Sequence, residues 1–133
     1  MEKVIIIIGL PGSGKSMYSK TLSYEYEIYD DFIFNFFDGK VINSLKTNNK
    51  ICLIDPRLCI INVFNKYIKK ILKYVSKNDI KLILYENNIN SCINNIKIRG
   101  NYNIVKDNLE NFSNLYNINY YISYKHIIFT VYI

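Results

Sequence analysis

Residues 9–16 have types and a spacing that suit the binding of phosphate groups. They read GLPGSGKS, which follows the pattern G-x-x-x-x-G-K-S without departure. The glycines allow backbone conformations that are closed to bulkier residues, so that main-chain N–H groups can surround an anion. Lys15 can reach the terminal phosphates of a nucleoside triphosphate, and the Ser16 hydroxyl is a ligand for Mg²⁺. The motif therefore predicts a phosphate-binding loop for a nucleoside triphosphate.

The sequence on either side of this loop fits the strand and the helix that such a loop requires. Residues 4–8 read VIIII, a continuous β-branched block typical of a strand buried on both faces. Residues 17–22 contain neither Gly nor Pro and can continue as a helix, whose positive dipole end would face the phosphates. A glycine turn that matched the motif by chance would not be expected to have a strand before it and a helix after it. The residues predicted to bind the nucleotide here are Gly9, Pro11, Gly12, Ser13, Gly14, Lys15 and Ser16.

A candidate metal ligand follows a later apolar block. Residues 51–54 read ICLI, and Asp55 comes directly after them. The carboxyl ends of parallel strands face the ligand crevice, and an Asp there can hold Mg²⁺ directly or through water. We therefore predict that Asp55 and Ser16 are the metal ligands. The alternative is that Asp55 starts a turn, because Asp-Pro commonly opens one.

Two neighbouring carboxylates, Asp30 and Asp31, follow a short strand-like segment at residues 26–29. Phosphoryl transfer needs a carboxylate that accepts the proton of the attacking hydroxyl. Neighbours on a chain point in different directions, so only one of the pair is expected to have this task. The alternative for both is a helix N-cap.

Strand-like and helix-like segments alternate along the whole chain. Strands are expected at residues 3–8, 26–29, 50–54, 80–85 and 126–133, and helices at about 15–25, 32–46, 57–77, 89–98 and 104–116. This alternation predicts an α/β fold, with a mostly parallel five-stranded sheet and helices on both faces. No linker or internal repeat divides residues 1–133, so we expect one domain.

The composition narrows the class of protein. Half of the 133 residues are hydrophobic, which excludes disorder, and no apolar run approaches the ~20 residues needed to cross a membrane. The N-terminal apolar block is too short for a signal peptide. The three cysteines, Cys52, Cys59 and Cys92, lack metal-site spacing and are expected to be reduced core residues. We therefore predict a cytoplasmic protein without a membrane partner.

The residue usage also indicates a source. The chain has 25 Ile and 19 Asn but no Ala, Gln or Trp. Ile, Asn, Lys and Tyr have AT-rich codons, so the gene is expected to come from an AT-rich genome, such as that of a large DNA virus or an AT-rich microbe. A viral origin would place the protein in the host cytoplasm.

The net charge of +6 comes almost entirely from lysine. Five lysines recur at helical spacing, at positions 66, 69, 70, 73 and 77. They form either the solvated face of an amphipathic helix, which we favour, or a track for nucleic-acid phosphates. The two arginines are Arg57 and Arg99. Where lysine is so strongly preferred, an arginine can mark a need for its planar fork, which holds phosphate in a bidentate way, although both can be ordinary surface cations.

Together these motifs resemble P-loop kinases of the polynucleotide-kinase and zeta-toxin-like group, over residues 3 to about 100. GLPGSGKS has the G-x-P-G-S-G-K-S form common in that group. Residues 29–32, YDDF, are similar to its D-D-[YF] element, and residues 55–58, DPRL, to its third-strand signature. Residues 94–99, NNIKIR, resemble the N-x-x-x-R stretch that opens its lid.

The resemblance implies a three-layer P-loop NTPase fold and an ATP-dependent, Mg²⁺-dependent kinase. It makes Asp30 the catalytic base and Lys15 and Arg99 the residues that embrace the phosphates of ATP. The expected reaction moves the γ-phosphate to a hydroxyl of a nucleoside, a nucleotide or a polynucleotide end, with nucleic acid the less favoured partner. The alternatives are a plain ATPase and a nucleotide-binding protein without transfer activity.

The chain departs from the pattern of that group in three places. The arginine that usually follows the Asp pair is missing, because residues 33–35 read IFN. The lid segment supplies one arginine, Arg99, where the kinases that it resembles have more, and the C-terminal part has no adenine-binding signature. A guanine-specifying N-K-x-D is also missing, since residues 65–68 read NKYI, which argues against a GTPase.

Overall fold

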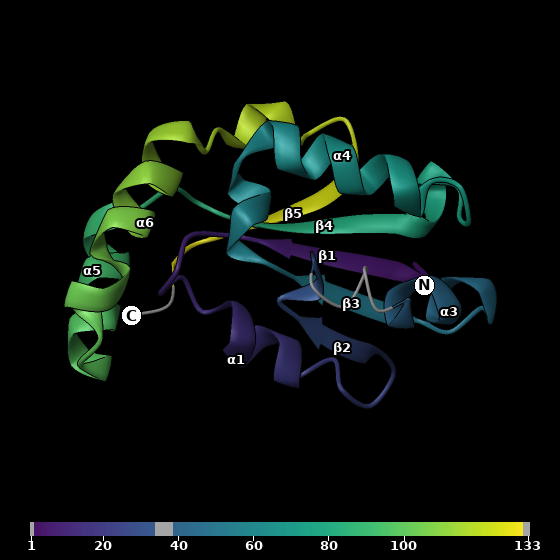
Figure 1. Ribbon diagram of the computed structural model, residues 1–133, viewed down its shortest axis with the longest axis horizontal. Helices are drawn as coiled ribbons and strands as arrows, with labels where there is room; N and C mark the ends of the chain where they lie inside the picture. Colours follow the sequence, from purple (N-terminus) through teal and green to yellow (C-terminus); the bar gives the residue numbers. More distant parts are fainter. Residues whose placement is uncertain (1, 34–38, 132–133) are drawn as a thin grey trace.

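Five parallel strands form the centre of the molecule, in the order β2-β3-β1-β4-β5 (Figure 1). The computed structural model describes residues 2–33 and 39–131. The strands are β1 (Val4–Ile8), β2 (Glu27–Asp30), β3 (Ile51–Ile54), β4 (Ile80–Tyr85) and β5 (Lys125–Phe129). Every neighbouring pair of these strands is parallel, which confirms the α/β fold and makes the described sheet entirely rather than mostly parallel.

Helices cover both faces of this sheet. They are α1 (Lys15–Lys20), α3 (Lys40–Lys46), α4 (Ile61–Ile71), α5 (Ile89–Arg99) and α6 (Tyr102–Leu115), with short 3₁₀ segments η1 (Pro56–Cys59), η2 (Lys77–Asp79) and η3 (Ile118–Tyr120). Figure 1 shows α4 over one face and α1 beneath the other, with α5 and α6 beyond the carboxyl ends of the strands. No helix in the described ranges is long and apolar enough to cross a membrane.

The central strand β1 is buried along its whole length. Successive side chains of a strand point to opposite faces, so β1 contributes to two separate cores. Ile6 belongs to the larger core, with Phe64 and Ile68 of α4. Ile7 belongs to the smaller core, against which Tyr18 of α1 packs. The unbroken apolar run in the sequence is thus explained by helices on both sides.

The connections define where a ligand can bind. The chain leaves the carboxyl end of β1 toward β2 and β3, and it leaves the neighbouring strand β4 in the opposite direction, toward β5. In open α/β sheets such a reversal leaves a crevice outside the carboxyl ends of the strands. The GLPGSGKS segment leads out of β1 at this point, as the sequence predicted.

The predicted helix over residues 57–77 is wrong in its bounds. The Asp55 side chain accepts a hydrogen bond from the Arg57 N–H at 3.0 Å and so caps η1. Ile60 then adopts an extended conformation, with φ −90° and ψ 114°, and α4 begins only at the next residue. A side-chain cap and one extended residue therefore divide what the apolar period presents as a single helix.

The helices expected at about 15–25 and 32–46 also differ from the structure in their bounds. α1 ends at Lys20 instead of about residue 25, and the hydroxyls of Thr21 and Ser23 donate to the backbone carbonyls three residues earlier. These bonds compete with the helical ladder. Part of the helix expected over 32–46, residues 34–38, lies outside the described residues, and α3 begins after Gly39, which has φ 79°.

The other helices and strands have the predicted bounds or differ from them by a few residues. β4 has the predicted bounds, α5 ends one residue later, and α6 spans 102–115 where 104–116 was expected. β5 spans Lys125–Phe129, shorter than the predicted strand over 126–133, of which residues 132–133 lie outside the described part.

The three cysteines are free and fully buried, as predicted. Burial raises the pKa of the Cys52 and Cys59 thiols to about 12 and that of Cys92 to about 11. Because the thiolate is the reactive form, we expect the native protein to react very slowly with an aromatic disulfide reagent at pH 8, and the unfolded protein to release three equivalents at once. Rapid labelling of any thiol in the native state would contradict this arrangement.

Candidate functional site

The glycine-rich loop (residues 9–16) joins the carboxyl end of β1 to the start of α1. Gly12 and Gly14 have φ angles of 84° and 109°, in the left-handed region that favours glycine. The Ser13 N–H donates to the Leu10 carbonyl at 3.1 Å and closes a tight turn. This is the backbone conformation for which the motif's glycines are needed.

Two glycines of the loop also allow close packing beneath it. A Cβ at Gly9 would lie 2.6 Å from Ser13 Oγ and 2.9 Å from Cβ of Tyr85, on β4. A Cβ at Gly12 would lie 2.7 Å from the backbone oxygen of Cys92, on α5. The loop therefore rests directly on β4 and α5, which are distant in the sequence.

Lys15 is held at the centre of the loop. Its side chain is only 8% exposed, and its Nζ donates to the Leu10 carbonyl at 2.7 Å. Burial lowers the pKa of Lys15, while the nearby thiols of Cys59 and Cys92 and the carboxylate of Asp30 act in the opposite direction. The loop thus carries a preplaced amine, whereas the Ser16 side chain next to it is exposed.

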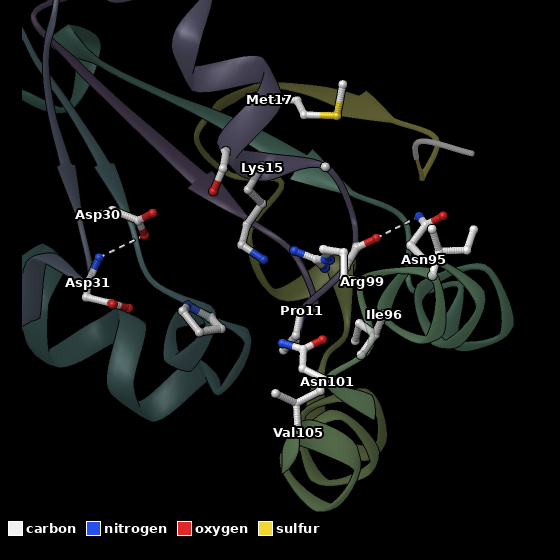
Figure 2. Close-up of a pocket in the computed structure, with 15 residues that line it drawn as sticks. Pro11, Lys15, Met17, Asp30, Asp31, Asn95, Ile96, Arg99, Asn101 and Val105 are labelled. Atoms are coloured by element: carbon white, nitrogen blue, oxygen red, sulfur yellow. Dashed lines mark hydrogen bonds between the residues drawn. The ribbon is translucent and has the colours of Figure 1, made fainter. Parts of the chain in front are cut away.

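A cavity of about 560 Å³ opens beside this loop (Figure 2). One wall comes from the loop and the start of α1, a second from Asp30, Asp31 and Pro56, and a third from α5 and α6. Figure 2 shows Lys15 and Arg99 between the aspartates on one side and α5 on the other. The cavity therefore brings together predicted residues from three segments: five from the glycine-rich loop, with Asp30 at the end of β2 and Arg99 on α5. The five from the loop are Pro11, Gly12, Gly14, Lys15 and Ser16.

The two aspartates lie together on one side of the cavity. Asp30 Oδ1 accepts a hydrogen bond from the Asp31 backbone N–H at 3.0 Å. Asp31 itself has a φ of 51°, an uncommon conformation for a residue with a side chain. Partial burial, together with the carboxylates of Asp30 and Asp55, raises the pKa of Asp31. Two like charges are thus kept close to each other at the cavity.

Asp55 lies in a different environment from the one we expected. Its side chain is fully buried and does not line the cavity, although the following Pro56 does. Oδ1 accepts from Arg57 Nε at 2.8 Å, and Oδ2 accepts from Nη2 at 2.6 Å. This pairing raises the pKa of Arg57. Metal binding by Asp55 stays a prediction, and it requires Arg57 to give up a carboxylate oxygen.

Arg99 reaches the cavity from the last turn of α5. The helix is tied to the glycine-rich loop, because Asn95 Nδ2 donates to the Gly12 carbonyl at 2.9 Å. Arg99 lies near enough to Lys15 to contribute to lowering its pKa. α5 therefore adds a second cation beside Lys15 and holds it on the loop.

A second cleft, also of about 560 Å³, was not predicted from the sequence. Its aromatic wall consists of three residues, Phe129, Tyr18 and Tyr85. The ring of Phe129 lies edge-on to the other two, with its centre 4.9 Å from that of Tyr18 and 5.6 Å from that of Tyr85. Gly14 and Met17 line both this cleft and the first cavity. The aromatic residues come from α1, β4 and β5, so no local sequence pattern indicates the cleft. Tyr85 and Phe129 become neighbours because β4 and β5 pair at these residues.

The lysines at positions 66, 69, 70, 73 and 77 do not lie on one helix, although their spacing predicted that they would. α4 ends at Ile71, so Lys73 follows it and Lys77 begins η2. The ammonium groups of Lys66 and Lys70 lie 5.5 and 5.0 Å from the ring centre of Tyr67. Cation–π contacts of this kind hold the two ammonium groups beside the ring.

No group of three or more His, Cys, Asp or Glu side chains gathers to hold a metal ion within residues 2–33 and 39–131. Mg²⁺ is usually bound through one or two side chains together with the phosphates of a substrate. The exposed Ser16 hydroxyl fits such a partial site, in which phosphate oxygens complete the coordination.

Comparison with known proteins identified one informative relative. No protein-family model matches the chain. The chain is 39% identical over 135 residues to "Uncharacterized protein R277" of Acanthamoeba polyphaga mimivirus, and the match covers 98% of each protein. An identity this high over nearly the full length of both chains reflects common descent and a common fold. The chain therefore belongs to the same protein family as this mimivirus protein.

Proposed function

We propose that the protein binds ATP with Mg²⁺ and transfers the γ-phosphate to a hydroxyl group, as a P-loop kinase. One observation carries the proposal: a single cavity contains a phosphate-binding type of loop, the amine of Lys15, the carboxylate of Asp30 and the guanidinium of Arg99. A phosphoryl transfer needs a phosphate cradle, positive charge and a proton acceptor in this kind of arrangement. The match to G-x-P-G-S-G-K-S supports the same assignment.

The phosphate end of ATP fits the glycine-rich loop. Gly12 and Gly14 have the left-handed backbone conformation that occurs in anion-binding loops of main-chain N–H groups. Lys15 already has its amine at the loop and would exchange the Leu10 carbonyl for a phosphate oxygen. The Ser16 hydroxyl would hold Mg²⁺, which would supply positive charge to the phosphates.

The nucleoside end of ATP fits the second cleft. This cleft shares Gly14 and Met17 with the phosphate cavity, so one molecule can extend from one to the other. The aromatic wall around Phe129 offers the apolar surface on which a base can pack. Tyr85 holds this wall to the loop, because its hydroxyl donates to the Gly14 carbonyl at 3.2 Å.

For the transfer itself we assign separate roles to the two sides of the cavity. The acceptor oxygen would attack the γ-phosphorus, the bond from this phosphorus to the β,γ-bridging oxygen would break, and the hydroxyl proton would pass to Asp30. Arg99, on the opposite side, would meet the negative charge that develops on the transferring group. Lys15 would hold the phosphates during the transfer.

A nucleotide-binding protein without transfer activity is the second candidate. It is favoured by one observation, the bidentate pairing of Asp55 with Arg57, which engages both oxygens of the predicted metal ligand.

For either function we place the protein in the cytoplasm of a host cell. The three buried free thiols and the viral relative support this location.

Incubation with γ-labelled ATP, Mg²⁺ and a panel of hydroxyl acceptors distinguishes these functions. We expect label to appear on an acceptor, and we expect the Asp30→Asn variant, purified in the same way, to label it roughly 10²–10⁴-fold more slowly, which controls for contaminating kinases. Release of free phosphate alone would indicate an ATPase. Binding of ATP by calorimetry with neither product would indicate the binding protein, and no binding would refute nucleotide recognition altogether.

A further inference from the structure

We propose that the acceptor carries no phosphate or other anionic group, and that it is a neutral or positively charged hydroxyl compound. This inference rests on the proposed function and concerns the side of the same cavity that faces Asp30. Of the three acceptors considered above, it selects a nucleoside over a nucleotide or a polynucleotide end.

The charges of the cavity carry the argument. Of the described residues that line it, the positively charged ones are Lys15 and Arg99, and the negatively charged ones are Asp30 and Asp31. A bound triphosphate would engage both cations. An acceptor approaching Asp30 would therefore meet two carboxylates and the phosphate that is being transferred. Among the described lining residues, an anionic acceptor would find no remaining counter-charge, whereas a neutral or cationic acceptor would not be repelled.

The nearby arginine does not change this balance. Arg57 is close enough to act on the pKa of Asp31. Its guanidinium, however, makes two hydrogen bonds to the carboxylate of Asp55, so the pair brings no net charge. Ile33, which follows the Asp pair two residues later, is buried in the larger core and brings no charge to the cavity.

The hydrogen-bonding groups on the aspartate side of the cavity support the same class of acceptor. The carboxylates of Asp30 and Asp31 accept hydrogen bonds and, when ionised, cannot donate them. These groups suit the donors of a hydroxyl or ammonium compound. The side chains of Ile96 and Val105 add an apolar wall for an uncharged body.

The test compares acceptors that differ in a phosphate placed away from the reacting hydroxyl. Each nucleoside is paired with its 3′-monophosphate and with its 5′-monophosphate, so that the hydroxyl at each end stays free in one phosphorylated member. The members are offered with labelled ATP and Mg²⁺, and kcat/KM is measured for each. We expect the phosphate-free member to be at least roughly tenfold better. A phosphorylated member that is equal or better would overturn the proposal.

A variant links the preference to the cavity. Asp31→Asn removes one negative charge, and asparagine tolerates a left-handed φ as well as aspartate does, so the fold should persist. We expect the ratio within each pair to fall severalfold in this variant and to stay unchanged in the control Asp79→Asn, which lies before β4, at the amino ends of the strands. A ratio that Asp31→Asn does not alter would refute the electrostatic cause.

Binding measurements separate this proposal from the proposed function. Calorimetry first tests ATP alone, and its failure to bind would refute the function and the acceptor class together. If ATP binds but no acceptor is labelled, the same pairs are titrated into protein saturated with a non-hydrolysable ATP analogue. Preferential binding of the phosphate-free members would then support the acceptor class although transfer is refuted, and equal or tighter binding of the phosphorylated members would overturn it.

Discussion

Replacing Asp30 with asparagine should lower the turnover of phosphate transfer by roughly 10²–10⁴ and leave the affinity for ATP close to that of the wild type. Asparagine has nearly the same shape, and its side-chain oxygen can still accept the Asp31 backbone N–H, as Asp30 does at 3.0 Å. It cannot take up the proton of the attacking hydroxyl at neutral pH. The loss should therefore appear in kcat, measured with labelled ATP, and not in ATP binding, measured by calorimetry.

The matched control for this change is Asp79→Asn. Asp79 ends η2 just before β4, whereas the cavity lies at the carboxyl ends of the strands, so the control makes the same chemical change far from the reaction. Its turnover should match the wild type. Equal turnover in wild type and Asp30→Asn would mean that Asp30 only orders the backbone of Asp31 and that another group accepts the proton.

Replacing Lys15 with alanine should weaken ATP binding by about 1.5–3 kcal/mol, which is the range for hydrogen bonds to charged groups. This corresponds to a roughly 10- to 150-fold higher Kd. The amine of Lys15 is the buried cation of the glycine-rich loop and is placed there before any ligand arrives. Its removal leaves the phosphates without that charge, so calorimetry with ATP and Mg²⁺ should detect the loss directly.

Two further variants test whether the loss of affinity in Lys15→Ala comes from a disturbed fold. Lys15→Met keeps an apolar stem of similar length in the buried position, and its affinity for ATP should fall by a similar factor. Lys20→Ala removes an exposed lysine from the last turn of the same helix and should change little. Wild-type affinity in both Lys15 variants would remove the basis for nucleotide binding at this loop.

The sequence by itself determined the elements whose cause is local. The β-branched run 4–8, the glycines after it and the apolar segment 80–85 each encode their own conformation, because continuous burial and left-handed φ angles restrict which residues are tolerated. Alternation of such segments with helical ones was sufficient to predict a parallel sheet. The positions of Asp30 and Lys15 followed as well, since parallel strands place their carboxyl ends along one edge.

The tertiary structure alone decided which of these side chains meet. Asp55 comes at the expected strand end, but burial turns its carboxylate to Arg57, two residues further on, and away from the cavity. Arg99 joins Lys15 because α5 packs on the glycine-rich loop through Asn95. The aromatic cleft around Phe129 likewise needs the pairing of β4 with β5. The last two of these contacts depend on packing between segments far apart in the chain, and no local pattern of residue types encodes them.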